Sequence, residues 1–254
     1  MIFKEKRTSM KKSDFLLRSV IIKSFFIVLS LSLPLLSFAQ WKFGITGGAA
    51  YNSYSIDTHY MDGWHFSSLL GGTAGFMGQY DIKEWIAIRT DLNWTMKNHR
   101  QKHLVTDENG DLFTTTSYYT YNHYIQLPIM ASLNTGSRNI RGFINLGGYG
   151  GYWLSSYLDF KENNYYYIPG ITMEYKDNSE KYTFDTNRDQ RYDLGLVGGV
   201  GVEFRFPFKK PSWAVQIESR YYYSLTSTQK DYMRIKDPKY NTTLVFQVAF
   251  YIIL

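Results

Sequence analysis

Apolar and polar residues alternate along eight stretches of this chain. A period of two residues indicates β-strands whose two faces meet different surroundings. The pattern is clearest in the final stretch, where one parity holds only apolar side chains: Leu244, Phe246, Val248, Phe250, Ile252 and Leu254. We therefore predict eight strands, near residues 41–51, 68–81, 84–97, 117–134, 141–158, 191–207, 213–225 and 242–254.

The connections between these stretches alternate between short and long. Three short connections hold turn-forming residues, at 81–84, 134–141 and 207–212. Four long, polar connections lie near 52–67, 98–116, 159–190 and 226–241. Outer-membrane barrels have both kinds, because their periplasmic turns are short and their extracellular loops are long. The sequence thus predicts an all-β fold: an eight-stranded antiparallel transmembrane β-barrel with both termini on the periplasmic side.

Alternation alone also fits a soluble, lipocalin-type ligand carrier whose apolar face points inward. The charged residues favour the membrane barrel, because lysines fall in connections or at strand ends, such as Lys42, Lys83 and Lys97. Mid-strand charges are mostly arginines and carboxylates, which a narrow, desolvated lumen needs as pairs. We predict a lumen charge network of seven residues: Arg89, Asp91, Asp193, Glu203, Arg205, Glu218 and Arg220.

The tryptophans fall near the two ends of the predicted strands. Trp41, Trp85 and Trp213 begin strands at the periplasmic side, whereas Trp94 and Trp153 lie towards the outer ends. Aromatic residues gather at both interfaces of an outer-membrane barrel. We therefore predict two aromatic belts on the lipid-facing wall.

Residues 1–39 have the layout of a secretory signal peptide. Lysines and arginines precede an apolar run from Phe25 to Leu36, and Ser37-Phe38-Ala39 has the small-x-small form of a cleavage site. The run is shorter than the roughly 20 residues of a membrane-spanning helix. We predict cleavage after Ala39, export to the bacterial outer membrane and a barrel domain of residues 40–254, with Met10 as an alternative start.

Charge and cysteine content exclude several classes of function. Residues 1–39 carry seven of the 28 Lys and Arg residues and two of the 22 Asp and Glu residues, so the mature chain would be nearly neutral. A nucleic-acid partner therefore has no electrostatic support. The absence of cysteine excludes disulfides, thiolate metal sites and a lipid-modified N-terminal cysteine.

Three motifs suggest cofactors or metals, but none fits its site. The glycine-rich segment 195–201 continues as a strand, whereas a phosphate loop must precede a helix. His99 and His103 have zinc-like spacing only on a helix, and we expect a polar loop there. The acidic segment 107–111 lacks the alternating ligands of a calcium loop. We expect no cofactor and no metal, and interpret the glycines as sites of tight curvature or lumen packing.

A catalytic site would need a nucleophile and a base at a strand end. His123, with Ser117 or Ser155 and an acid from a loop, is the candidate set for a lipid-modifying hydrolase. His65 lies in a predicted loop with no evident orienting acid. We therefore expect a protein that is not an enzyme.

Pro128 lies within the fourth predicted strand. Proline removes a backbone donor and is unfavourable in a central strand. The sequence therefore predicts a bulge or a local break in strand pairing at this point.

Three segments, Tyr124–Pro128, Asn145–Tyr152 and Tyr192–Phe204, resemble the PorT-type outer-membrane β-barrel family. The resemblance extends over essentially the whole mature chain, with the segments in the same strand order. It implies an eight-stranded barrel in a Gram-negative outer membrane. It also implies a possible link to protein secretion, with which the founding member is associated, although most members have no assigned activity.

We predict a non-enzymatic barrel with a structural, interaction or secretion-accessory role. The alternatives are the hydrolase and a porin-like channel for small solutes, although eight strands leave an interior that side chains fill. The expected partners are outer-membrane lipid, the barrel-assembly machinery and a secretion-system or surface protein. A tyrosine-rich extracellular loop would bind that protein, or would extend the barrel wall, through five residues: Tyr165, Tyr166, Tyr167, Tyr175 and Tyr182.

Overall fold

The computed structural model describes residues 40–55, 64–106, 112–137, 139–162, 177–206, 212–230 and 239–254. They form ten strands: β1 (Gln40–Ser55), β2 (Trp64–Lys83), β3 (Ile86–Met96), β4 (His99–Thr106), β5 (Leu112–Gly136), β6 (Ile140–Glu162), β7 (Asp177–Lys181), β8 (Tyr192–Phe206), β9 (Ser212–Ser227) and β10 (Tyr240–Ile253). No helix within these ranges is long and apolar enough to cross a membrane. Residues 1–39 lie outside them, so the signal peptide and its cleavage remain predictions.

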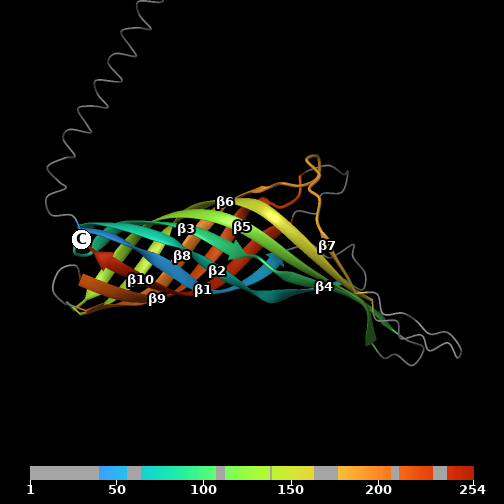
Figure 1. Cartoon of the computed structure of the whole chain (residues 1–254), viewed down its shortest axis with the longest axis horizontal. Helices are drawn as coiled ribbons and strands as arrows, with labels where there is room; N and C mark the ends of the chain where they lie inside the picture. Colours follow the sequence, from blue (N-terminus) through green and yellow to red (C-terminus); the bar gives the residue numbers. More distant parts are fainter. Residues whose placement is uncertain are drawn as a thin grey trace, which may run out of the picture. The chain divides into compact units, whose positions relative to one another are not determined.

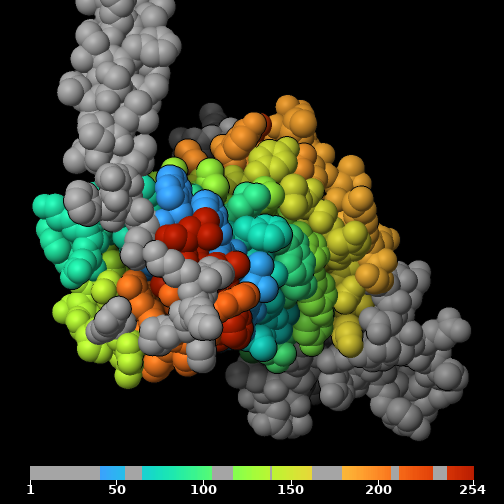
Figure 2. Space-filling view, turned by 60° about the vertical axis from the view of Figure 1, so that its left-hand side comes forward, coloured from blue at the N-terminus to red at the C-terminus, as the bar shows by residue number. Residues whose placement is uncertain are grey.

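The strands close into one antiparallel ring of eight (Figure 1). Neighbours pair in the order β1, β2, β3, β5, β6, β8, β9 and β10, and β10 pairs again with β1. Figure 2 shows β1, in blue, beside β10, in red. The other two strands prolong the wall: β4 continues from β3, and β7 pairs with β6 beyond the end of β8. The predicted eight-stranded barrel is confirmed, and each predicted stretch coincides with the core of one strand.

The two faces of the wall show which solvent surrounds the barrel. Large apolar side chains point outward, and Leu70 and Phe76 are each 69% exposed. The interior instead holds polar and charged side chains, including the fully buried Arg89 and Arg220. In water such a wall would expose an apolar belt far larger than soluble proteins tolerate, whereas a bilayer covers it. The lipocalin-type alternative, with its apolar face inward, does not fit.

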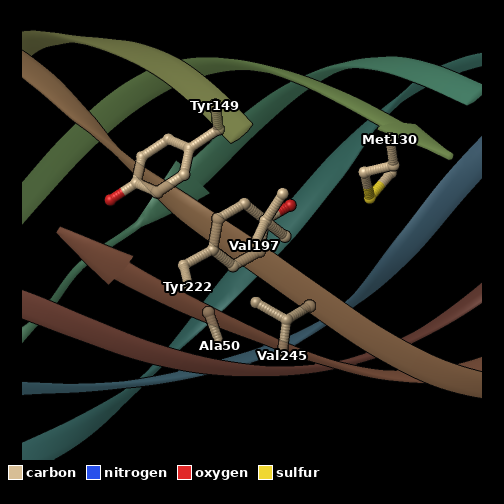
Figure 3. Close-up of a cluster of buried hydrophobic side chains, with 6 residues drawn as sticks. All are labelled: Ala50, Met130, Tyr149, Val197, Tyr222 and Val245. Carbon is tan, nitrogen blue, oxygen red and sulfur yellow. The ribbon is translucent and has the colours of Figure 1, made fainter. Parts of the chain in front are cut away.

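Apolar packing inside the barrel is limited to small clusters. One consists of six side chains from six strands, which Figure 3 shows inside the barrel: Ala50, Met130, Tyr149, Val197, Tyr222 and Val245. The rings of Tyr149 and Tyr222 meet edge to face, with centroids 5.1 Å apart. A second cluster lies nearer the short turns and contains Met77, Ala214, Ala249 and Tyr251. Polar side chains fill the space between and around these clusters.

Several strands are longer than the sequence predicts. Two short connections are as expected, since only residues 84–85 separate β2 from β3 and only residues 137–139 separate β5 from β6. The third, predicted at 207–212, lies almost entirely outside the described residues. The predicted loop at 98–116 is wrong over most of its length, because it contains β4 and the start of β5. The predicted loop at 159–190 likewise contains the end of β6 and all of β7. Polar residues here keep their backbone groups paired by continuing the sheet.

Pro128 interrupts pairing on one side of β5. The register between β3 and β5 runs to Thr90 opposite Ile129 and resumes at Asn93 opposite Gln126. On the other side, Pro128 stays in register with β6. The Thr90 hydroxyl donates to the Pro128 carbonyl at 3.1 Å. The predicted local break is therefore present, and it affects only the contact with β3.

Candidate functional site

Four charged side chains span the centre of the lumen. Arg89 and Asp91 come from β3, and Glu218 and Arg220 come from β9 on the opposite side of the ring. Arg220 Nη1 lies 2.6 Å from Asp91 Oδ2, and its Nη2 lies 2.8 Å from Glu218 Oε2. Arg89 contacts Asp91 at 3.0 Å and Glu218 at 3.2 Å. Each arginine thus pairs with both carboxylates, and the four side chains form a closed cycle across the lumen.

A second charged group lies nearer the short-turn end. Lys42 Nζ is 3.0 Å from Asp81 Oδ2 and 3.5 Å from Glu203 Oε2. Arg205 pairs with the same two carboxylates. Gln216 joins this group to the central one, because its amide donates to Glu203 at 2.9 Å and its carbonyl oxygen accepts from a central arginine at 2.6 Å. The two groups therefore form one continuous network.

Asp193 lies apart from this network, towards the outer mouth. Lys97 Nζ is 2.6 Å from Asp193 Oδ2, while the hydroxyls of Tyr149 and Ser224 donate to its Oδ1 at 3.0 and 2.6 Å. The Lys97 ammonium also lies over two tyrosine rings, a favourable contact for a desolvated cation. The structure thus brings six of the seven predicted lumen charges together and places the seventh beside a lysine.

The interior charges balance. Among the described residues, the ion pairs join five cations with five carboxylates: Lys42, Arg89, Lys97, Arg205 and Arg220 with Asp81, Asp91, Asp193, Glu203 and Glu218. Burial costs several kcal/mol per ion unless each charge is paired and hydrogen-bonded. Amides complete the bonding, as Asn145 and Gln247 each donate to Glu218. This arrangement holds the lumen filled and neutral.

Sequence reasoning missed three members of this set. The sequence predicts Lys42 and Lys97 at strand ends and Asp81 in a turn, yet the two lysines are fully buried and Asp81 nearly so. Parity was the available signal, because Lys97 shares the inward parity of Arg89 and Asp91 along the same segment. The stagger of the strands brings these ends inside the ring.

A cleft of about 140 Å³ opens at the outer mouth of the barrel. It lies beyond the Lys97–Asp193 pair, because His99 and Gln101 of β4, which follows Lys97, form part of its wall. Asn122 of β5 forms another part. The residues important for its chemistry are Tyr54, His99, Asn122, Trp153, Tyr182 and Asp189. Aromatic rings and neutral polar groups therefore dominate this part of the wall.

Two predicted surface residues lie in this cleft. The prediction that Trp153 belongs to a lipid-facing belt is wrong. This residue faces inward, is 8% exposed and stacks against Tyr124. Tyr182 is half-buried and stacks on Trp153 with centroids 6.1 Å apart. Its hydroxyl donates to Asp189, and burial together with that contact raises the pKa of Tyr182 to about 12. The other loop tyrosines, Tyr165, Tyr166, Tyr167 and Tyr175, lie outside the described residues.

The candidate catalytic and metal residues have other surroundings. His123 is opposite Ser155 in the β5–β6 register, but its ring packs between Trp94 and Tyr157 on the outer wall. Ser117 is buried on β5 and pairs with β4, while His65 is exposed on β2 rather than in a loop. His99 and His103 lie on the strand β4, so the expected polar loop is wrong and helical zinc spacing does not apply. The acidic segment 107–111 lies outside the described residues.

Comparison with known proteins points to one family. The family model described as outer membrane protein beta-barrel domain matches residues 38–230. No curated protein matches the sequence.

Several solved structures are similar to this chain at low identity. Neisserial surface protein A is 12% identical, with 82% of this chain and 95% of that chain covered and a TM-score of 0.37. The outer membrane protein OprG from Pseudomonas aeruginosa is 10% identical, with 84% and 95% covered and a TM-score of 0.41. The outer membrane protease OmpT from Escherichia coli is 9% identical, with 85% and 96% covered and a TM-score of 0.43.

Proposed function

This chain belongs to the outer membrane protein beta-barrel domain family, and from this premise we propose that it is a non-enzymatic barrel whose lumen is closed. We further propose that the outer rim of the barrel binds another protein. The specific form of the proposal is a secretion-accessory role, which the resemblance of three segments to PorT-type barrels supports. The observation that carries the closed-lumen part is the ion-pair cycle formed by residues of β3 and β9.

The cross-linked interior argues against a solute channel. Arg220 and Asp91 belong to opposite walls, and their side chains meet at 2.6 Å in the centre of the barrel. A solute would have to separate such pairs and leave buried charges uncompensated, which costs several kcal/mol. We therefore expect proteoliposomes that contain the barrel to exclude small sugars. Osmotic swelling in those sugars would contradict the closed lumen and favour the porin-like alternative.

The rim supplies a surface suited to a protein partner. Strands β4, β5 and β6 continue as a sheet beyond β8, and their side chains form an aromatic and basic group there. The Arg100 guanidinium and the Lys161 ammonium lie 5.9 and 5.6 Å from the centroid of the Tyr119 ring, whereas Tyr118 packs against Phe160 on the other face of the sheet. Tyrosine and arginine are enriched at binding hot spots. We propose that an acidic or aromatic surface of a partner docks against this rim.

Photo-crosslinking in cells tests the rim. A photoreactive phenylalanine analogue in place of Tyr119 is expected to form adducts with one or a few proteins. The same analogue in place of Tyr221, on the lipid-facing wall, serves as the matched control. Protein adducts at neither position, or equal adducts at both, would contradict the proposed rim. Deletion of the gene should also reduce the set of secreted proteins in the medium; unchanged secretion removes the secretion-accessory form.

The hydrolase alternative rests on the position of His123 opposite Ser155. Purified protein in phospholipid or lipopolysaccharide vesicles is expected to release no acyl chains. Acyl release that disappears in His123→Ala but persists in His65→Ala would replace the non-enzymatic proposal with the hydrolase.

A further inference from the structure

The wall of the outer cleft contains three polar groups without a partner among the described residues. These are the Nδ1 of His99, the Oδ1 of Asn122 and the indole N–H of Trp153. All three side chains are at least nine-tenths buried. Buried polar atoms are nearly always hydrogen-bonded, so three unmet ones around one cleft indicate a missing partner.

The types of these groups limit the partner. The indole N–H of Trp153 can only donate, the amide oxygen of Asn122 can only accept, and the imidazole nitrogen of His99 can do either, depending on its tautomer. A phosphate or carboxylate only accepts, and an ammonium only donates. Hydroxyl groups both donate and accept, so a ligand with several hydroxyls matches the set.

The aromatic residues limit the shape of the partner. The ring of Tyr54 meets that of His99 edge to face at 4.4 Å, and the Trp153 ring stacks with Tyr182. Because Tyr124 also stacks on Trp153, the indole offers its N–H edge to the cleft, and the other rings offer apolar surface beside polar groups. A sugar ring has the same combination of C–H faces and hydroxyl edges. The volume of about 140 Å³ is close to the roughly 150 Å³ of a protein cavity that binds benzene, which is also a six-membered ring.

The charged groups at the cleft favour a neutral ligand. The Asp189 carboxylate already accepts hydrogen bonds from the Tyr182 hydroxyl and from the backbone N–H of Asp185. Lys239, which also lines the cleft, has a partner as well. A charged ligand would have to displace these contacts, whereas a neutral one would not.

We propose that the outer cleft is a binding site for a neutral sugar ring. This inference goes beyond the proposed partner-binding role and does not depend on it. The ligand could be a free sugar that reaches the cell surface or the terminal sugar of a surface glycan, because both present the same chemistry.

The test uses the full-length mature barrel, refolded without lipopolysaccharide in lauryldimethylamine oxide, because sugar-based detergents would compete. The protein carries 5-fluorotryptophan, and a panel of neutral methyl glycosides is titrated while fluorine NMR is recorded. We expect at least one glycoside to shift the Trp153 resonance saturably. A second titration with a neutral lipopolysaccharide core oligosaccharide distinguishes a glycan end from a free sugar.

Matched variants locate the binding. Trp153→Phe keeps an aromatic ring but removes the indole donor and with it the fluorine reporter, so the variants are compared by saturation-transfer NMR. It should weaken binding about tenfold, the effect of losing one good hydrogen bond. Trp94→Phe makes the same change on the outer wall and should leave affinity within about twofold. If Trp153→Phe fails to show the heat-modifiable migration of a folded barrel, His99→Phe provides the same comparison, with saturation-transfer NMR as the readout.

Two results would overturn the proposal. One is the absence of saturable binding of any neutral glycoside or oligosaccharide at millimolar concentration to folded protein, which would mean that the cleft holds only water. The other is binding that Trp94→Phe weakens as much as Trp153→Phe. Neither result would affect the closed lumen or the rim, whose tests do not involve sugars.

Discussion

The centre of the barrel and its outer mouth satisfy buried polar groups in different ways. In the centre, Arg220 donates to two carboxylates and to the Tyr222 hydroxyl, so that the guanidinium has three partners within 3.0 Å. At the mouth, His99, Asn122 and Trp153 each keep an unmet atom among the described residues. Amides such as Asn145 and Gln247 also keep an unmet oxygen in the lumen, but there every described charged group is paired. Of the described residues with unmet atoms, only His99, Asn122 and Trp153 line the outer cleft. This difference is why we expect the centre to contribute most to stability, and why the proposed ligand site is placed at the mouth.

The largest predicted effect comes from breaking the central cycle. Arg220→Met leaves Asp91 and Glu218 buried with a single arginine between them and should reduce the free energy of unfolding by about 3–5 kcal/mol. Denaturant unfolding in lipid vesicles, followed by tryptophan fluorescence, measures the loss. Arg141→Met is the control, because this half-buried arginine donates to the Glu84 carbonyl and belongs to none of the ion pairs among the described residues. It should change stability by less than about 0.5 kcal/mol. Equal losses in the two variants would show that the cycle contributes no special stability.

The Lys97–Asp193 pair lies between the two regions and should have an intermediate effect. Lys97→Met should cost about 2–3 kcal/mol, less than the central variant, because Asp193 retains donors from Tyr149 and Ser224. Asp193→Asn combined with Lys97→Met completes a double-mutant cycle in the same unfolding experiment. Strict additivity of the two losses would show that the pair is not coupled.

Two adjacent glycines of β6 allow the stability cost of an added methyl group to be compared on the inward and the outward face of the wall. At the inward Gly147 an added Cβ would overlap the Ile129 carbonyl and lie 2.7 Å from Met130 Cα, whereas at the outward Gly148 it would meet the Gly195 carbonyl oxygen at an ordinary 3.5 Å. Gly147→Ala should therefore cost about 1–3 kcal/mol of unfolding free energy, and Gly148→Ala should be nearly neutral. The reverse order would show that the close approach of β5 and β6 is not required for stability.

The smallest effect concerns the mouth. The pKa of Tyr182 is raised to about 12, so its contact with Asp189 is fully present below pH 10 and is lost as the pH rises through about 12. In protein labelled with carbon-13 at the tyrosine ring, one resonance should titrate near pH 12 and disappear in Tyr182→Phe. The substitution should lower stability by about 1 kcal/mol or less. Titration of that resonance near pH 10 would show that the hydroxyl is not held by Asp189.

Alternation within strands was sufficient to predict the barrel and the inward parity of Arg89, Asp91, Glu203 and Glu218. It could not predict how far the strands continue, because the polar residues of β4 and β7 resemble loop residues when only composition is considered. The sequence also did not predict that Lys42 and Lys97 take part in the ion pairs of the lumen. Lysine near a strand end is ordinarily a solvated residue, and only the position of that end inside the ring decides otherwise.

The sequence by itself determined that eight strands have one apolar and one polar face, because side-chain direction in a strand has a period of two residues. Only the tertiary structure decided which inward residues meet. Arg220 and Asp91 are 129 positions apart, and their contact depends on the stagger of strands around the closed ring. Trp153, by contrast, faces the outer cleft because it shares the inward parity of Asn145 and Tyr149 on β6. Parity selects a face, but the height at which each residue stands in the lumen is set by the closure of the barrel.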